Sequence, residues 1–109
     1  MIEKKILNPS RIRHIDGGFA FIPHRFLTGG FLSSLSAEEL LLYFFLALVS
    51  DRNGLSFYSY DVICSLLQLR LDEYVEARNQ LIDKGLIAFD GTLFQVLQLP
   101  EKPIERNLR

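Results

Sequence analysis

An uninterrupted run of apolar residues at positions 40–49, LLLYFFLALV, is the feature that most restricts how this chain can fold. Just before it, Ser36 and Glu39 have the spacing of a capping box, in which each side chain accepts a hydrogen bond from the backbone N–H of the other residue. We therefore predict a helix that begins after Ser36 and runs to about Ser50. Because this helix is apolar on every side, it should also be covered on every side.

The cover for this helix can come from two sources. The upstream sequence FAFIPHRFL, residues 19–27, has alternating apolar residues before Pro23, which predicts a short extended segment that could wrap over the helix. A second subunit is the other source, and Tyr43, Phe44 and Phe45 are then the candidate interface residues. We therefore expect a homodimer or a larger protein partner.

Downstream of the apolar run, the pattern changes to short helices and strands. The sequence LSFYS predicts a short strand, and YDVICSLLQL a short helix. A third helix should run from about Leu71 to Lys84 and end at Gly85 in the left-handed conformation. The runs LIAF and TLFQVLQL, joined by Asp90-Gly91, predict a β-hairpin with a two-residue type I′ turn. The side chains expected to face inward from the second helix are Val62, Ile63, Leu66 and Leu67.

Composition and charge divide the chain into three parts. Its 109 residues, 49% apolar and 23% charged, are typical of one globular domain, which we place at residues 19–100. Residues 1–18 read as an N-terminal arm that ends in two glycines, and residues 101–109 as a polar tail. The formal charge is +3 over residues 1–30, −5 over residues 31–100 and +1 over the tail. The predicted domain is therefore acidic and its arm is basic, although an arm without a function would also carry so modest an excess.

The sequence VICSLLQLRLDEYVEARNQLIDKGLIAF, residues 62–89, resembles the winged helix-turn-helix superfamily. The matching positions are Ile63, Leu66, Leu67, Leu69, Tyr74, Leu81, Ile82, Gly85, Leu86 and Ile87. This resemblance, over roughly residues 36–99, implies an α+β, mainly helical fold: three helices plus a small antiparallel sheet or hairpin, preceded by an extended N-terminal segment. The upstream segment is similar to the entry into the winged-helix domains of plasmid and phage replication initiators. The whole chain is also similar to small bacterial proteins that accompany mobile elements.

A winged helix that binds DNA places the outer face of its third helix in the major groove, and here that face is acidic. The residues expected on it are Asp72, Glu73, Glu76, Asn79, Gln80 and Asp83, with Lys84 at its edge. Its carboxylates would repel phosphates, which supply most nonspecific affinity. Asn79 and Gln80 could still read adenine, and Arg70 could read guanine or hold a phosphate. The outer face thus allows base readout but gives conventional docking little electrostatic support.

The predicted hairpin does not supply the missing positive charge, because residues 86–100 contain no base. The candidates outside the third helix are Arg11, Arg13, His14, His24, Arg25, Arg52, Lys102 and Arg106. An arm that enters the minor groove, like that of homeodomains, is the physical precedent. We therefore predict a protein that binds double-stranded DNA, as an accessory or regulatory factor in replication, transposition or transcription.

The alternative is a non-catalytic winged-helix module for dimerisation or assembly with another protein, without DNA binding. The acidic third helix and the apolar first helix would then be its contact surfaces. Arg78 lies in the apolar stripe of the third helix, so either its stem packs while its head reaches solvent, or it pairs with an acid such as Asp61 or contacts another subunit.

Other classes of protein have little support in the sequence. No HExxH, P-loop or GxSxG pattern occurs, and the two histidines are isolated, so we expect neither an enzyme nor a cofactor or metal site. The one cysteine, Cys64, lies among apolar residues and reads as a buried structural thiol. The apolar run is about half of the roughly 20 residues that span a membrane, and no signal-peptide pattern opens the chain. A cytoplasmic protein is the expectation.

Overall fold

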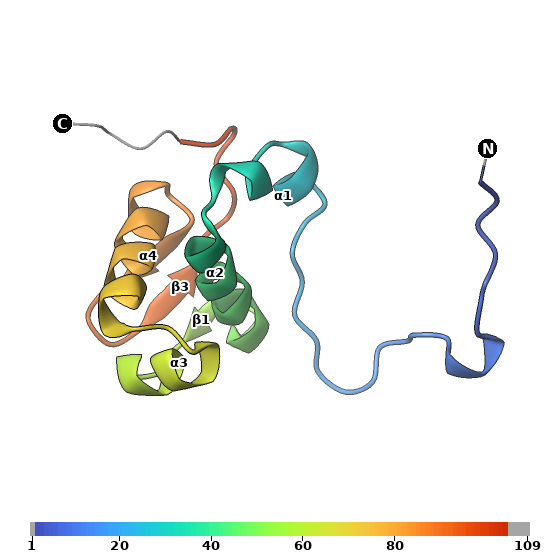
Figure 1. Cartoon of the computed structure of the whole chain (residues 1–109), viewed down its shortest axis with the longest axis horizontal. Helices are drawn as coiled ribbons and strands as arrows, with labels where there is room; N and C mark the ends of the chain where they lie inside the picture. The colour runs from blue at the N-terminus through green and yellow to red at the C-terminus, as the bar shows by residue number, and fades with distance from the viewer. Residues whose placement is uncertain (1, 105–109) are drawn as a thin grey trace.

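The helix predicted from the apolar run is α2, Ala37–Val49, and it packs against both α4 and β3 in the computed structural model, which describes residues 2–104 (Figure 1). Its start is the predicted capping box. Ser36 Oγ accepts a hydrogen bond from the Glu39 N–H at 3.2 Å, and the Glu39 carboxylate accepts one from the Ser36 N–H at 3.2 Å. These contacts satisfy two backbone donors that a helix start would otherwise leave open. The predicted first helix is confirmed.

Two helices joined by a short turn follow it. They are α3, Tyr60–Leu67, and α4, Leu71–Asp83. The chain leaves α3 through Gln68, whose φ of 56° is left-handed, and then turns directly into α4. At the end of α4, Gly85 has a φ of +71°, and the Leu86 N–H donates to the Leu81 carbonyl at 3.0 Å. This is the glycine-terminated helix end that the sequence predicted.

The strands form one antiparallel sheet in the order β1-β3-β2, with bounds Leu55–Ser56 for β1, Ile87–Phe89 for β2 and Phe94–Val96 for β3. Phe89 lies opposite Phe94, so the loop between β2 and β3 has four residues. The predicted two-residue turn is therefore wrong. The Asp90 carboxylate causes the difference, because it accepts hydrogen bonds from the N–H groups of Thr92 and Leu93 at 2.9 and 2.7 Å and so closes a wider loop. The hairpin itself and the mainly helical α+β fold are confirmed.

The N-terminal part of the chain leaves the domain. Residues 2–18 are exposed throughout, with a single 3-10 turn η1, Pro9–Arg11, and Figure 1 shows them running away from α2 on the side opposite α4. Residues 19–23 are extended, but α1, Arg25–Thr28, is a helical turn, so the extended prediction for residues 19–27 was wrong in its second half. Proline disfavours helix at the residue before it, but its own fixed φ suits a helix start, and the Pro23 carbonyl accepts the Phe26 N–H at 2.9 Å. A second 3-10 turn, η2, Leu32–Ser34, then leads into α2.

The core lies between α2, α4 and the sheet. Its largest fully buried side chains are Tyr74, Phe31, Phe94, Leu42, Leu46, Ile63, Leu81, Leu86 and Ile87. The upstream segment covers only part of α2, where Phe26 stacks on Tyr43. Leu41, Phe44 and Leu48 form an exposed line on α2, which we call the α2 stripe. Cover of this stripe by a second subunit, the other predicted source, stays a prediction. The second helix also differs from its prediction, since Val62 and Leu66 are exposed.

Among the helices of residues 2–104, none combines the length and the apolar character that crossing a bilayer requires.

Candidate nucleic-acid interface

The outer face of α4 is the surface that a helix-turn-helix presents to DNA. Tyr74, Ala77 and Leu81 turn into the core, and the opposite side of the helix leaves the following residues in solvent: Asp72, Glu76, Asn79 and Asp83. A shallow groove on this side is also lined by Leu71 and Val75. The outer face is therefore acidic and partly apolar, and of the two predicted base-reading residues of α4 it leaves Asn79 exposed.

Gln80 lines the same groove as Glu76 and Asn79, on the side of α4 where the helical wheel places it, but its exposed fraction is only 7%. Gln80 is three residues after buried Ala77 and directly before buried Leu81, so it lies at the edge of the outer face, next to the buried side. Little of its side chain is therefore open to a base.

Arg70 precedes α4 and is held by the acids of the first turn. Its Nε lies 3.2 Å from Asp72 Oδ1, and its Nη2 lies 3.8 Å from Glu73 Oε2. The Glu73 carboxylate also accepts the Arg70 N–H at 2.9 Å. The hydrogen bond from Arg70 lowers the pKa of Asp72, which remains charged beside it. Arg70 lies at the start of α4, and its charge is partly balanced by these neighbours.

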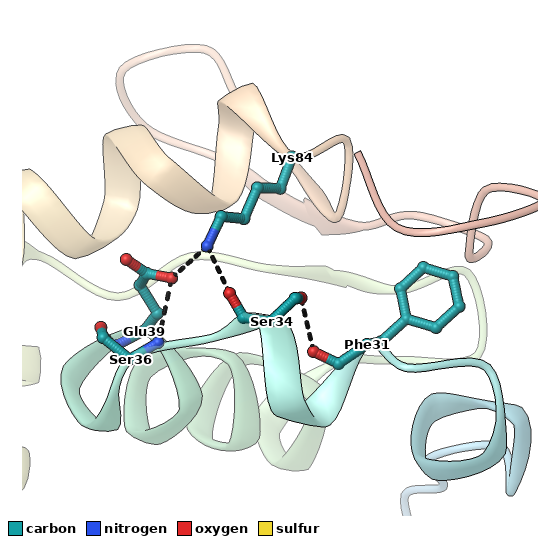
Figure 2. A network of polar contacts seen from close by, with 5 residues as sticks. All are labelled: Phe31, Ser34, Ser36, Glu39 and Lys84. Carbon is teal, nitrogen blue, oxygen red and sulfur yellow. Dashed lines mark hydrogen bonds and ion pairs between the residues drawn. The ribbon is translucent and has the colours of Figure 1, made fainter. Parts of the chain in front are cut away.

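Lys84 is drawn away from the outer face into a mostly buried ion pair. Figure 2 shows its Nζ between Glu39 Oε1 and the Ser34 carbonyl, each at 2.7 Å. The Lys84 and Glu39 side chains are each 11% exposed. Because the Glu39 carboxylate also caps α2, Lys84 joins the end of α4 to the start of α2. The prediction that Lys84 lies at the edge of the outer face was therefore wrong.

Arg25 and Arg52 lie on a different part of the domain. The Arg25 guanidinium donates to the carbonyls of Leu99 at 2.9 Å and Glu101 at 3.1 Å, and it lies 5.3 Å from the centre of the Phe31 ring. Arg52 is exposed in the turn after α2. Both line one recess that contains no residue of α4. The structure therefore brings these two arginines together but does not bring them to the outer face of α4.

The remaining candidate bases lie at the ends of the chain. Arg11 and Arg13, with Lys4, Lys5 and His14, are exposed on the arm, and Lys102 is exposed near the other end. Arg106 lies outside the described residues. The arm is the largest group of free positive charge in residues 2–104, because the ion pairs there involve only Arg70 and Lys84.

Two of the three predicted interface residues are buried inside the domain. Tyr43 is 2% exposed and stacks on Phe26, with ring centres 4.9 Å apart. Phe45 is 8% exposed and meets Tyr58 edge-on at 5.4 Å. Phe44 is 52% exposed in the α2 stripe, so it is the one of the three that can meet a partner.

Arg78 and a group of aromatic residues form a feature that the sequence interpretation missed. The Arg78 guanidinium lies 5.5 Å from the centre of the Tyr74 ring and 5.2 Å from that of Phe89. Its Nε and Nη2 groups donate hydrogen bonds to Asn79 Oδ1, each at 3.3 Å, and not to Asp61. The residues Phe57, Tyr58 and Tyr60 line the same recess. The available signal was the sequence FYSY, which places three aromatic residues at a helix start.

Groups with catalytic or metal-binding chemistry are sparse. Burial, and to a smaller extent the charge of Asp61, raises the pKa of the Cys64 thiol, so it stays protonated and a poor nucleophile near neutral pH. No cluster of three or more His, Cys, Asp or Glu side chains that could hold a metal occurs in the part of the chain that the structure describes.

Comparison with known proteins agrees with this geometry. Residues 33–87, half of the chain, match the family described as a helix-turn-helix domain, and the matched region contains α2, α3 and α4. Searches of the curated proteins and of the solved structures gave no match. A helix-turn-helix domain suggests a DNA partner. The chain belongs to this helix-turn-helix domain family.

Proposed function

We propose that the protein binds double-stranded DNA through the outer face of α4 and the basic arm. The observation that carries the proposal is the helix-turn-helix itself: α3 and α4 are joined by a tight turn, and the outer face of α4 is open to solvent. In such a motif the second helix enters the major groove while the first crosses the DNA backbone.

The charges of the outer face of α4 and of the basic arm determine how much each can contribute to DNA affinity. The outer face of α4 carries Asp72, Glu76 and Asp83 without a base, so it weakens the attraction to phosphate. Arg11 and Arg13 are exposed on a segment that extends from the domain, and they can reach phosphates or the minor groove beside the site. We propose that the arm supplies affinity and that Asn79 and Arg70 contribute base contacts.

The biological role that we propose is that of an accessory or regulatory factor in replication, transposition or transcription. A single small domain without a catalytic constellation among its described residues suits a factor that marks a site for other proteins.

A binding experiment with acid-to-amide variants tests the docking of α4. Fluorescence anisotropy of a labelled duplex at low salt should detect binding by the wild-type protein. Glu76→Gln and Asp83→Asn remove negative charge from the outer face, so each should tighten binding. Glu101→Gln, an exposed acid outside α4, is the matched control and should have little effect. If the folded wild-type protein shifts no duplex at low salt, the proposal is wrong.

The second candidate function is assembly with another protein without DNA binding. The α2 stripe favours it, because Leu41, Phe44 and Leu48 are 39%, 52% and 56% exposed and lie on one side of the helix. Self-association through the stripe does not by itself exclude DNA binding, so the second candidate function is distinguished by the absence of DNA binding. The two functions also differ in salt dependence, because added salt weakens phosphate contacts and leaves apolar contacts intact.

A further inference from the structure

A recess with aromatic walls lies between α4, the β1–α3 connection and the loop that joins β2 to β3. Its side chains come from Phe57, Tyr58, Tyr60, Tyr74, Arg78 and Phe89. These segments include the start of α3, the middle of α4 and the β2–β3 loop, which holds the place of the wing in a winged helix. The recess therefore borders the elements through which a winged helix approaches DNA.

The rings on the outer side of this recess are unusually exposed. Phe57 is 72% exposed, Tyr60 57% and Tyr58 40%, whereas Tyr74 at the base is 1% exposed. Single exposed apolar residues are ordinary on protein surfaces, but three aromatic rings within four positions form a continuous surface that water solvates poorly. Flat rings of this kind offer faces for stacking.

Arg78 adds a positive charge that no carboxylate of the described residues balances. Its guanidinium lies over the Tyr74 and Phe89 rings, and the ion pairs found in residues 2–104 do not include it. Burial raises the pKa of Tyr74 more than Arg78 lowers it, so the phenol stays neutral and cannot act as a counter-ion. Arg78 is thus available to an anion.

Two acids lie near the recess in the chain and bind groups of its wall rather than Arg78. Asp61 interacts with the hydroxyl of Ser59, which lowers the pKa of Asp61, and Asp90 accepts hydrogen bonds from the N–H groups of Thr92 and Leu93. Neither Asp61 nor Asp90 lines the recess. The recess therefore differs from the outer face of α4, because it combines stacking surfaces with an unbalanced cation.

We propose that this recess binds an unpaired nucleotide, with its base stacked on Phe57 or Tyr60 and its phosphate on Arg78. Stacking on exposed aromatic rings together with a basic group is the general means by which proteins hold single strands. A duplex cannot use these rings without opening, because its bases are stacked on each other. The inference rests on the proposed function and deepens it, since it names single-stranded or locally opened DNA as the preferred form of the ligand.

Fluorescence anisotropy with a labelled oligothymidylate strand and a labelled duplex tests the inference. Wild-type protein should bind the single strand, and Phe57→Ala and Tyr60→Ala should each weaken that binding roughly 5- to 150-fold, the range expected for loss of one stacked base. Arg78→Gln should weaken it as well. The matched control is Phe21→Ala, which removes a 74% exposed ring from the segment before α1, outside the recess, and should leave binding unchanged. Phe57 and Tyr60 are exposed, so these variants should fold normally, which circular dichroism checks.

The outcomes separate this inference from the proposed function. Duplex binding without single-strand binding overturns the inference and leaves the proposed function standing. Single-strand binding that depends on Phe57 and Tyr60, without duplex binding, supports the inference and contradicts the duplex proposal. Equal losses in Phe21→Ala would assign the effect to general apolar contact and overturn the inference. Binding of an acidic peptide that is lost in the same variants, with no binding of the oligothymidylate, would identify a protein ligand and also overturn it.

Discussion

Lys84 Nζ lies 2.7 Å from Glu39 Oε1, and this ion pair joins the end of α4 to the start of α2. Both side chains are 11% exposed, so water screens the pair only weakly. Lys84 also donates to the Ser34 carbonyl, and Glu39 also accepts the Ser36 N–H (Figure 2). One lysine thus fixes the position of the predicted recognition helix relative to the helix behind it.

Replacing Lys84 with Met should destabilise the protein by about 3 kcal/mol, because it leaves the Glu39 carboxylate buried without its cation. Urea unfolding of the variant and the wild type measures the difference in the free energy of unfolding. Arg70→Met is the matched control, since it breaks an ion pair whose two side chains are each 75% exposed and should change stability little. Similar effects of the two substitutions would contradict the structural role of Lys84.

Replacing both partners should cost less than the two single substitutions added together. In Glu39→Gln/Lys84→Met no buried charge is left alone, so the double variant recovers part of the loss. The same urea experiment completes a double-mutant cycle. Additive effects would show that the two side chains do not interact in solution.

Gly54 allows close approach of the chain to β3, and Gly54→Ala should destabilise the fold by roughly 2 kcal/mol. Its φ is +83°, and a Cβ at this position would lie 2.5 Å from the Val96 carbonyl oxygen. The Val96 N–H also donates to the Gly54 carbonyl at 2.8 Å, so the backbone cannot easily move away. Gly18→Ala is the control, because nothing lies within 4 Å of the added Cβ. Thermal unfolding that is equal for the two variants would contradict this account.

The β2–β3 loop should loosen in acid. Hydrogen bonds from the N–H groups of Leu93 and then Thr92 lower the pKa of Asp90. A carboxyl whose pKa is lower when folded contributes stability above its ordinary pKa and loses it as the pH falls through the lowered value. Amide hydrogen exchange of Thr92 and Leu93 should therefore lose protection as the pH falls below about 4, once the intrinsic pH dependence of exchange is removed. In Asp90→Asn, which cannot titrate, the protection should be independent of pH, and a parallel loss in this variant would disprove the role of Asp90.

The α2 stripe should join two copies of the chain. Sedimentation of the wild type at high micromolar concentration should show a dimer, and Phe44→Glu should return it to a monomer, because the charge would be buried at the interface. Leu27→Glu is the control, since Leu27 is 66% exposed on α1, outside the stripe. A wild-type monomer at this concentration would rule out the predicted homodimer.

The features that the sequence predicted well are local ones. The capping box depends on Ser36 and Glu39, three residues apart, and the end of α4 depends on Gly85, so each can be recognised within one helical turn. The order of α3, the turn and α4 was likewise predicted from a local pattern, the spacing of apolar residues along the chain. Local patterns misled the prediction at Asp90, whose side chain closes a wider loop than its dipeptide suggested, and at residues 25–28, which form α1 instead of an extended segment.

The features that were missed depend on contacts between distant segments. Lys84 meets Glu39 across 45 positions, and the burial of Gln80 could not be predicted from the sequence of α4 alone. An apolar residue such as Phe44 carries no local mark that separates it from buried Tyr43 next to it. For the candidate site, the sequence therefore predicted the acidic outer face of α4 but not which polar residues of α4 remain available on it.

The salt dependence of duplex binding tests the central claim most directly, because that claim assigns the phosphate contacts to the arm. For wild-type protein, the logarithm of the binding constant should fall linearly with the logarithm of the salt concentration. Arg11→Ala/Arg13→Ala should weaken binding at low salt and reduce the magnitude of the slope by about 2, one for each lost phosphate contact. An unchanged slope in this variant, or no salt-dependent binding by the folded wild-type protein, would contradict the account.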